Sequence, residues 1–146
     1  MKTIGRHLIA EFYGCDVDVI NSLEDIKTHM CDAAVKIGAT VLGEKFHQFT
    51  PQGVSGTVVI AESHLSIHTW PEVGYVAVDI FTCGGLDPNI GFKHLGLQFK
   101  AESARVQEIV RGLPEDIAEY GQVGPDDVSV ITKMTTEIDL GTDEAA

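Results

Sequence analysis

The sequence predicts a two-layer α+β sandwich, with a mostly antiparallel sheet and helices packed on one of its faces. Four apolar segments with alternating polarity follow one another between residues 39 and 83. A segment with helical periodicity precedes this run, and another follows it. Consecutive strands joined by short turns pair antiparallel, whereas a doubly wound sheet needs a crossover helix between strands. The order strand, helix, four strands, helix, strand therefore favours helices on one face of an antiparallel sheet.

The first two elements are a strand over residues 3–13 and a helix over residues 23–37. The first segment is rich in apolar and aromatic residues and ends at Gly14. Asn21-Ser22 supplies a cap for the helix, and Gly38 supplies a stop. The apolar residues of the helix recur at helical spacing and predict one buried stripe: Leu23, Ile26, Met30, Ala33, Ala34 and Ile37.

Two hairpins are predicted next. The first joins strands over residues 40–50 and 54–61 through the turn Pro51-Gln52-Gly53. The second joins strands over residues 62–70 and 75–83, separated by a Pro-Glu-Val-Gly turn.

The remaining elements are a helix and a last strand. Asp87-Pro88 predicts a cap and a first-turn proline for a helix over residues 89–100, which Gly91 and Gly96 weaken. Alternating apolar residues predict a strand over residues 104–110.

Composition and charge limit the classes of protein. A chain of 146 residues fits one domain, predicted over residues 1–112. Residues 113–146 hold nine acids and one base, or −8 of the net charge of −12, and predict an acidic, partly disordered extension. An acidic chain argues against nucleic acid, and no apolar run is long enough for a membrane span. Three separated cysteines and an N-terminus without a signal-peptide pattern predict a cytoplasmic protein with reduced thiols.

Chemistry is expected in the stretch ESHLSIHTWPE, residues 62–72, where polar residues interrupt an apolar sheet. A serine at a strand end with histidine nearby suggests a nucleophile. Strand alternation places Ser63 on the face opposite His64 and His68, so the chain must turn or bend at Ser63 for the two kinds of side chain to meet. Trp70 is predicted in the core.

Several strings resemble the prokaryotic S-adenosylmethionine decarboxylase proenzyme family. They are GRHLIAEFYGCD, FHQFTPQGVSG, GVSGTVVIAESHLSIHTWPE and YVAVDIFTCG, and together they cover most of residues 4–100. The resemblance implies autocatalytic cleavage between Glu62 and Ser63, which gives chains 1–62 and 63–146. It also implies that Ser63 becomes a covalent pyruvoyl cofactor, which forms a Schiff base with the amine of the substrate.

The resemblance assigns roles to further residues. His68 is implied as the base that removes a proton during processing, and Ser55 as a hydrogen-bond donor in the same step. Cys83 is implied as the proton donor in decarboxylation, a role that suits a thiol because it stays mostly protonated near neutral pH. Glu72 and Phe49 match positions that hold the ribose and the adenine of the substrate.

The implied function is decarboxylation of S-adenosylmethionine to the aminopropyl donor for spermidine synthesis. A homodimer of processed protomers, four chains in all, is implied, with each site between two protomers. Two alternatives stay open: the same chemistry acting on arginine or ornithine, and a small-molecule binding protein that never cleaves itself.

The other polar residues are predicted to have ordinary roles. His64 and His68 are four apart, but without a helix or a third ligand they do not predict a metal site. His7, His29, His47 and His94 are predicted to have surface or packing roles.

Overall fold

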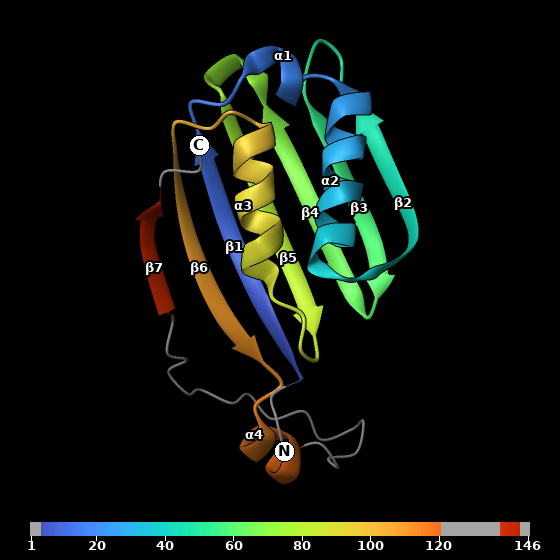
Figure 1. Cartoon of the computed structure of the whole chain (residues 1–146), viewed down its shortest axis with the longest axis vertical. Helices are drawn as coiled ribbons and strands as arrows, with labels where there is room; N and C mark the ends of the chain where they lie inside the picture. Colours follow the sequence, from blue (N-terminus) through green and yellow to red (C-terminus); the bar gives the residue numbers. More distant parts are fainter. Residues whose placement is uncertain (1–3, 121–137, 144–146) are drawn as a thin grey trace.

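The chain folds as one antiparallel sheet with two main helices on one face, as the computed structural model in Figure 1 shows. The structure describes residues 4–120 and 138–143. In the described residues the strand order is β2-β3-β4-β5-β1-β6-β7, with every neighbouring pair antiparallel. The predicted fold class is confirmed.

The bounds of the elements are as follows. The strands are β1 (Gly5–Tyr13), β2 (Thr40–Gln48), β3 (Val54–Ala61), β4 (Ser63–Trp70), β5 (Tyr75–Cys83), β6 (Ser103–Arg111) and β7 (Ile138–Asp143). The helices are α1 (Val17–Ile20), α2 (Leu23–Ile37), α3 (Pro88–Gln98), α4 (Pro114–Tyr120) and the short 3₁₀ helix η1 (Pro71–Val73).

The first long helix, α2, begins and ends where its residues predict. The Ser22 hydroxyl accepts a hydrogen bond from the amide of Asp25 at 3.2 Å, and Gly38 ends the helix with φ of 93°. The helix packs on β2 and β3, and its buried residues are Ile26, Met30, Ala33, Ala34 and Ile37. The predicted stripe is therefore the face that meets the sheet.

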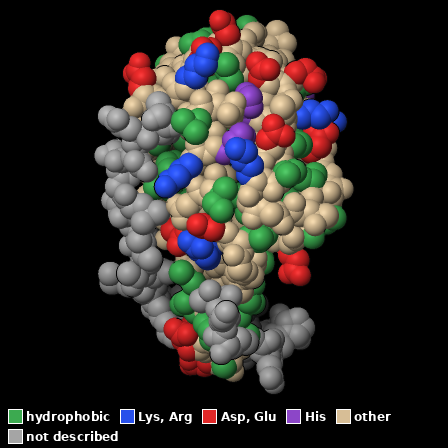
Figure 2. All heavy atoms as spheres, viewed as in Figure 1, with side chains coloured by type: hydrophobic (Ala, Val, Ile, Leu, Met, Phe, Trp, Pro, Cys, Tyr) green, Lys and Arg blue, Asp and Glu red, His purple; other side chains and the backbone are tan. Residues whose placement is uncertain are grey.

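The second long helix, α3, covers β1 and β5 beside α2. Asp87 caps its first turn, and Gly91 lies where α3 meets both α2 and β5. A methyl group at Gly91 would lie 2.6 Å from Cδ1 of Ile37, so the glycine that weakens the helix permits its close packing. Figure 2, which views this side of the molecule, shows acidic and basic side chains interspersed over it.

Alternate residues of the central strands divide the sheet into a covered and an open face. On β4, Leu65 and Ile67 are buried beneath the helices, while the side chains between them lie on the open face. Trp70 belongs to this second set: it is 41% exposed and stacks on Tyr75. The prediction of a core Trp70 was wrong, because the helices cover one face only.

Four elements were not predicted as helices or strands: α1, η1, α4 and β7. The last two lie beyond residue 112, where β7 pairs with β6. The division between residues 1–112 and 113–146 stays a prediction, and much of the acidic stretch lies outside the described residues. Among the described residues no helix is both long and apolar enough to cross a bilayer.

Candidate active site

The predicted cleavage bond lies where the chain turns from β3 into β4. The last pair of this hairpin is Ile60 opposite Ser63, so the chain reverses through Ala61, the last residue of β3, and Glu62. Ser63 has φ of 130°, a conformation that residues other than glycine rarely adopt. The chain therefore turns immediately before Ser63, and the backbone at Ser63 departs from regular strand geometry.

Ser63 and Cys83 lie side by side at this end of the sheet. The Ser63 hydroxyl oxygen is 3.1 Å from the Cys83 sulfur, although 20 residues separate them in sequence. The β4–β5 pairing brings them together, because its first pair is His64 opposite Phe81. A hollow of about 400 Å³ borders Cys83 and the turn before Ser63, and its lining residues are Gly38, Thr40, Ala61, Glu62, Cys83, Gly84 and Leu86.

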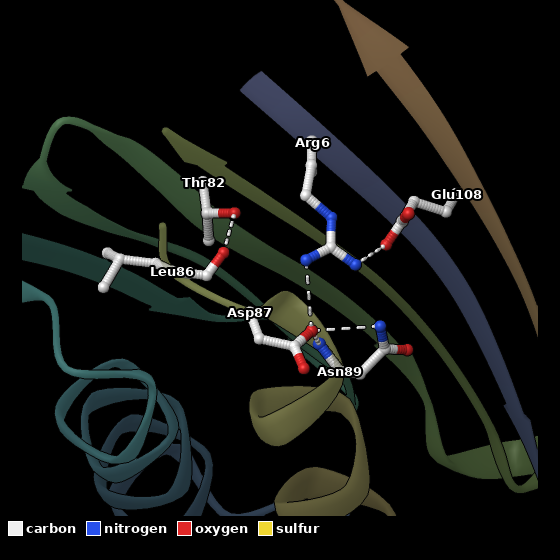
Figure 3. Close-up of polar contacts among 6 residues, drawn as sticks. All are labelled: Arg6, Thr82, Leu86, Asp87, Asn89 and Glu108. Carbon is white, nitrogen blue, oxygen red and sulfur yellow. Dashed lines mark hydrogen bonds and ion pairs between the residues drawn. The ribbon is translucent and has the colours of Figure 1, made fainter. Parts of the chain in front are cut away.

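Polar contacts on the covered side hold the loop that follows β5 (Figure 3). The Thr82 hydroxyl donates to the carbonyl of Leu86 at 3.2 Å. Arg6 donates to the Glu108 carboxylate at 2.6 Å and approaches Asp87 at 3.5 Å. This bridge joins β1 and β6 to the first turn of α3, so the loop is fixed at both of its ends.

Ser55 and His68 form a second pair on the neighbouring strands. They lie opposite each other in the β3–β4 register, with 2.8 Å between the Ser55 hydroxyl and Nδ1 of His68. His68 stands five residues after Ser63 on β4, a separation of about 16 Å along a strand. Within one chain, His68 therefore cannot reach Ser63.

Glu72 and Phe49 lie beyond this second pair. Glu72 is exposed in η1, which follows β4, and Phe49 follows β2. The ring of Phe49 is 47% exposed and meets the ring of His47 edge-on at 4.7 Å. The predicted site residues thus form two groups near opposite ends of the sheet. The first group holds Glu62, Ser63 and Cys83, and the second holds Ser55, His68, Glu72 and Phe49.

A cluster on the open face was missed in the sequence. Asp79 accepts hydrogen bonds from Nε2 of His7 at 2.7 Å and from Nε2 of His64 at 2.8 Å, and Ser66 donates to its other oxygen. Burial opposes the ionisation of Asp79, but the bonds from His7, Ser66 and His64 outweigh it and hold the pKa of its carboxyl at about 2. A lone acid in the apolar string YVAVDIFTC was the available signal.

Three of these residues are also the described side chains best arranged to hold a metal ion. The ligand atoms of His7, His64 and Asp79 lie within 4.8 Å of one another. Arg111 donates to Nδ1 of His7 at 3.1 Å, so the proton of a neutral His7 ring is on Nε2 and points at Asp79. The ionised carboxylate also accepts a hydrogen bond from Nε2 of His64, so hydrogen bonds already use the atoms that a cation would need.

A shallow hollow extends from His68 to the cluster around Asp79. Its volume is about 230 Å³, and its lining residues are His7, Ile9, Glu11, His68, Ala77, Val78 and Asp79. The Tyr75 hydroxyl donates to Glu11 beside it. The open face is therefore indented and carries polar as well as aromatic groups.

Comparison with known proteins identifies the family. The model of the family "S-adenosylmethionine decarboxylase" matches residues 6–112. An S-adenosylmethionine decarboxylase proenzyme of Fervidobacterium nodosum is 52% identical over 118 residues, which cover 80% of this chain and 86% of that protein. One of Clostridium kluyveri is 48% identical over 120 residues, covering 82% and 95%.

A solved structure agrees with these relatives. The crystal structure of the adenosylmethionine decarboxylase from Aquifex aeolicus superposes with a TM-score of 0.72 at 36% identity, covering 77% of this chain and 94% of that one. Sequence and fold thus lead to the same conclusion, and this chain belongs to the S-adenosylmethionine decarboxylase family.

Proposed function

We propose that this chain is a proenzyme that cleaves itself between Glu62 and Ser63 and then decarboxylates S-adenosylmethionine. The proposal depends most on one observation: Ser63 directly follows a tight turn, and its hydroxyl lies 3.1 Å from the only cysteine at that end of the described sheet. Family membership supports the substrate and the pyruvoyl cofactor. The product would be the aminopropyl donor for spermidine synthesis, made in the cytoplasm.

Self-cleavage begins at Ser63. Its hydroxyl oxygen attacks the carbonyl carbon of Glu62, and the peptide bond becomes an ester as the nitrogen leaves. A base then removes the α-proton of Ser63, and the carboxylate of Glu62 departs by β-elimination. Addition of water and loss of ammonia leave a ketone at residue 63. The proposed base is the His68 ring, whose Nδ1 forms a hydrogen bond with the Ser55 hydroxyl.

A second copy of the chain must supply that base. Ser63 and His68 of one copy are about 16 Å apart along β4, too far for proton transfer. The helices leave one sheet face uncovered, and His68, Trp70 and Tyr13 are exposed on it. In a two-fold dimer joined through this face, a contact between Ser63 of one copy and His68 of the other occurs twice, once in each direction. We therefore propose a homodimer with two shared sites.

Decarboxylation uses residues of both groups. The pyruvoyl group supplies an electron-withdrawing carbonyl for an amine-bearing substrate that loses carbon dioxide. Cys83 is placed for this reaction because its sulfur lies 3.1 Å from the Ser63 hydroxyl oxygen before cleavage, and so beside residue 63. Its thiol donates the proton that replaces the lost carboxylate. Glu72 and Phe49 of the partner copy hold the ribose hydroxyls and the adenine ring.

Steady-state turnover tests the choice of substrate. We expect kcat/KM for S-adenosylmethionine to exceed the values for arginine and ornithine by at least about 100-fold, because a site built for a nucleoside leaves its polar groups unpaired with smaller amino acids. Carbon dioxide release from each of the three is the measurement. Equal or faster turnover of arginine or ornithine would show that the proposed substrate is wrong, while the proposed self-cleavage would stand. Absence of both cleavage and turnover would leave a binding protein.

A further inference from the structure

Cleavage creates a difficulty for residue 63, on the proposed function. It becomes the first residue of the second chain, and chain ends fray unless they are tied down. Ser63 pairs with Ile60 on β3 but lies outside the β4–β5 register. After cleavage, the first chain, whose strand β3 pairs with residue 63, ends at Glu62 just beyond that strand. Backbone pairing alone therefore holds the reactive group weakly.

The next residue is held much better. His64 is the first residue of β4 that pairs on both sides, with Val59 on β3 and Phe81 on β5. Its side chain lies on the open face and donates from Nε2 to the Asp79 carboxylate at 2.8 Å. Its ring also meets the ring of Phe81 edge-on, with centroids 5.9 Å apart.

Asp79 is in turn held by side chains of β1 and β6, on the side of β5 away from β4. His7 on β1 donates to the same carboxylate oxygen at 2.7 Å, and Arg111 on β6 donates to His7 at 3.1 Å. The guanidinium carbon of Arg111 lies 4.9 Å from the centre of the Phe81 ring. Side chains from four neighbouring strands thus form one connected network that ends at His64.

We infer that His64, Asp79, His7 and Arg111 form a terminal anchor, which keeps residue 63 beside Cys83 once the chain ahead of it has been cut. The anchor residues are positioning residues, because they act through the backbone of residue 64. The anchor matters little before cleavage, when the turn itself holds Ser63. It matters in the processed enzyme, where the reactive ketone is one bond from a free end.

The test compares cleaved proteins carrying substitutions at both ends of the His64–Asp79 hydrogen bond. In Asp79→Asn and His64→Ala, we expect amide hydrogen exchange of residues 64–66 to become at least about tenfold faster. We also expect kcat to fall by about 10- to 100-fold, because the ketone of residue 63 would be displaced from its reactive position. KM should change less than about twofold. KM is spared because the contacts that form the anchor involve neither Glu72 nor Phe49, which hold the substrate from the partner copy.

Two further variants separate anchoring from general damage. His64→Gln keeps an N–H donor for Asp79, so its amide exchange should be as slow as in the wild type. If Asp79→Asn stays uncleaved, the comparison of His64→Ala with His64→Gln is the test. Cys31→Ala changes a side chain of α2 on the covered side of the sheet, outside the anchor, and should match the wild type. Wild-type exchange and kcat in His64→Ala, or an equal loss in Cys31→Ala, would overturn the anchor. An uncleaved wild-type chain would instead overturn the proposed function.

Discussion

Ser63→Ala is expected to remain one uncleaved chain and to release no carbon dioxide from S-adenosylmethionine. Alanine has no oxygen to attack the carbonyl of Glu62, and it cannot become a ketone. Intact mass spectrometry under denaturing conditions is the measurement. The wild type should show two chains meeting at Glu62 and Ser63, with the second lighter by one ammonia than a serine-started peptide.

Ser66→Ala is the matched control for this experiment. It removes a hydroxyl three residues further along β4, where the side chain binds Asp79 rather than facing Cys83. It should cleave as the wild type does. A Ser63→Ala chain that still divides after residue 62 would show that another nucleophile opens the bond.

Cys83→Ala is expected to cleave and yet to decarboxylate at least about 100-fold more slowly, the usual contribution of a positioned acid. The Cys83 sulfur lies close to the Ser63 hydroxyl oxygen, but it takes no part in cleavage. In that reaction the Ser63 oxygen attacks Glu62, and His68 is the base that removes the α-proton. Cleavage is read from intact mass, and kcat from carbon dioxide release by fully cleaved protein.

Cys31→Ala provides the comparison, since Cys31 lies in α2 on the covered side of the sheet. It should leave both cleavage and kcat near the wild-type values. If cleaved Cys83→Ala retains wild-type kcat, the proton comes from another group, and the contact with residue 63 has a different purpose.

Local signals were enough to predict most of the fold. Ser22 and Gly38 mark the two ends of α2, and the turn at Pro51 marks the first hairpin. The four-residue helix α1 was missed because it depends on a single cap, with Asp16 accepting from two backbone amides. Pairing of β7 with β6 is a contact between distant segments, which periodicity within one segment does not reveal.

The candidate site was predictable by residue type and only partly by position. Alternation along β4 correctly separated Leu65 and Ile67 from His64 and His68. It also predicted a turn or a bend at Ser63 that would bring Ser63 and the histidines together. The chain does turn before Ser63, but Ser63 and His68 stay about 16 Å apart along the strand. Alternation gave no sign that His7 lies beside Asp79, because strand order decides which residues share a row across the sheet. The roles of the predicted site residues stay predictions.

The shared site is the central claim, and mixing two inactive variants tests it most directly. Ser63→Ala and His68→Ala are each expected to stay uncleaved when produced alone. Produced together with different tags, they should form dimers in which Ser63 of one copy faces His68 of the other. We predict that the His68→Ala chain is then cleaved, with the ketone on its second fragment, while the Ser63→Ala chain stays whole. No cleavage in isolated mixed dimers, or full cleavage of His68→Ala by itself, would contradict a site shared between two copies.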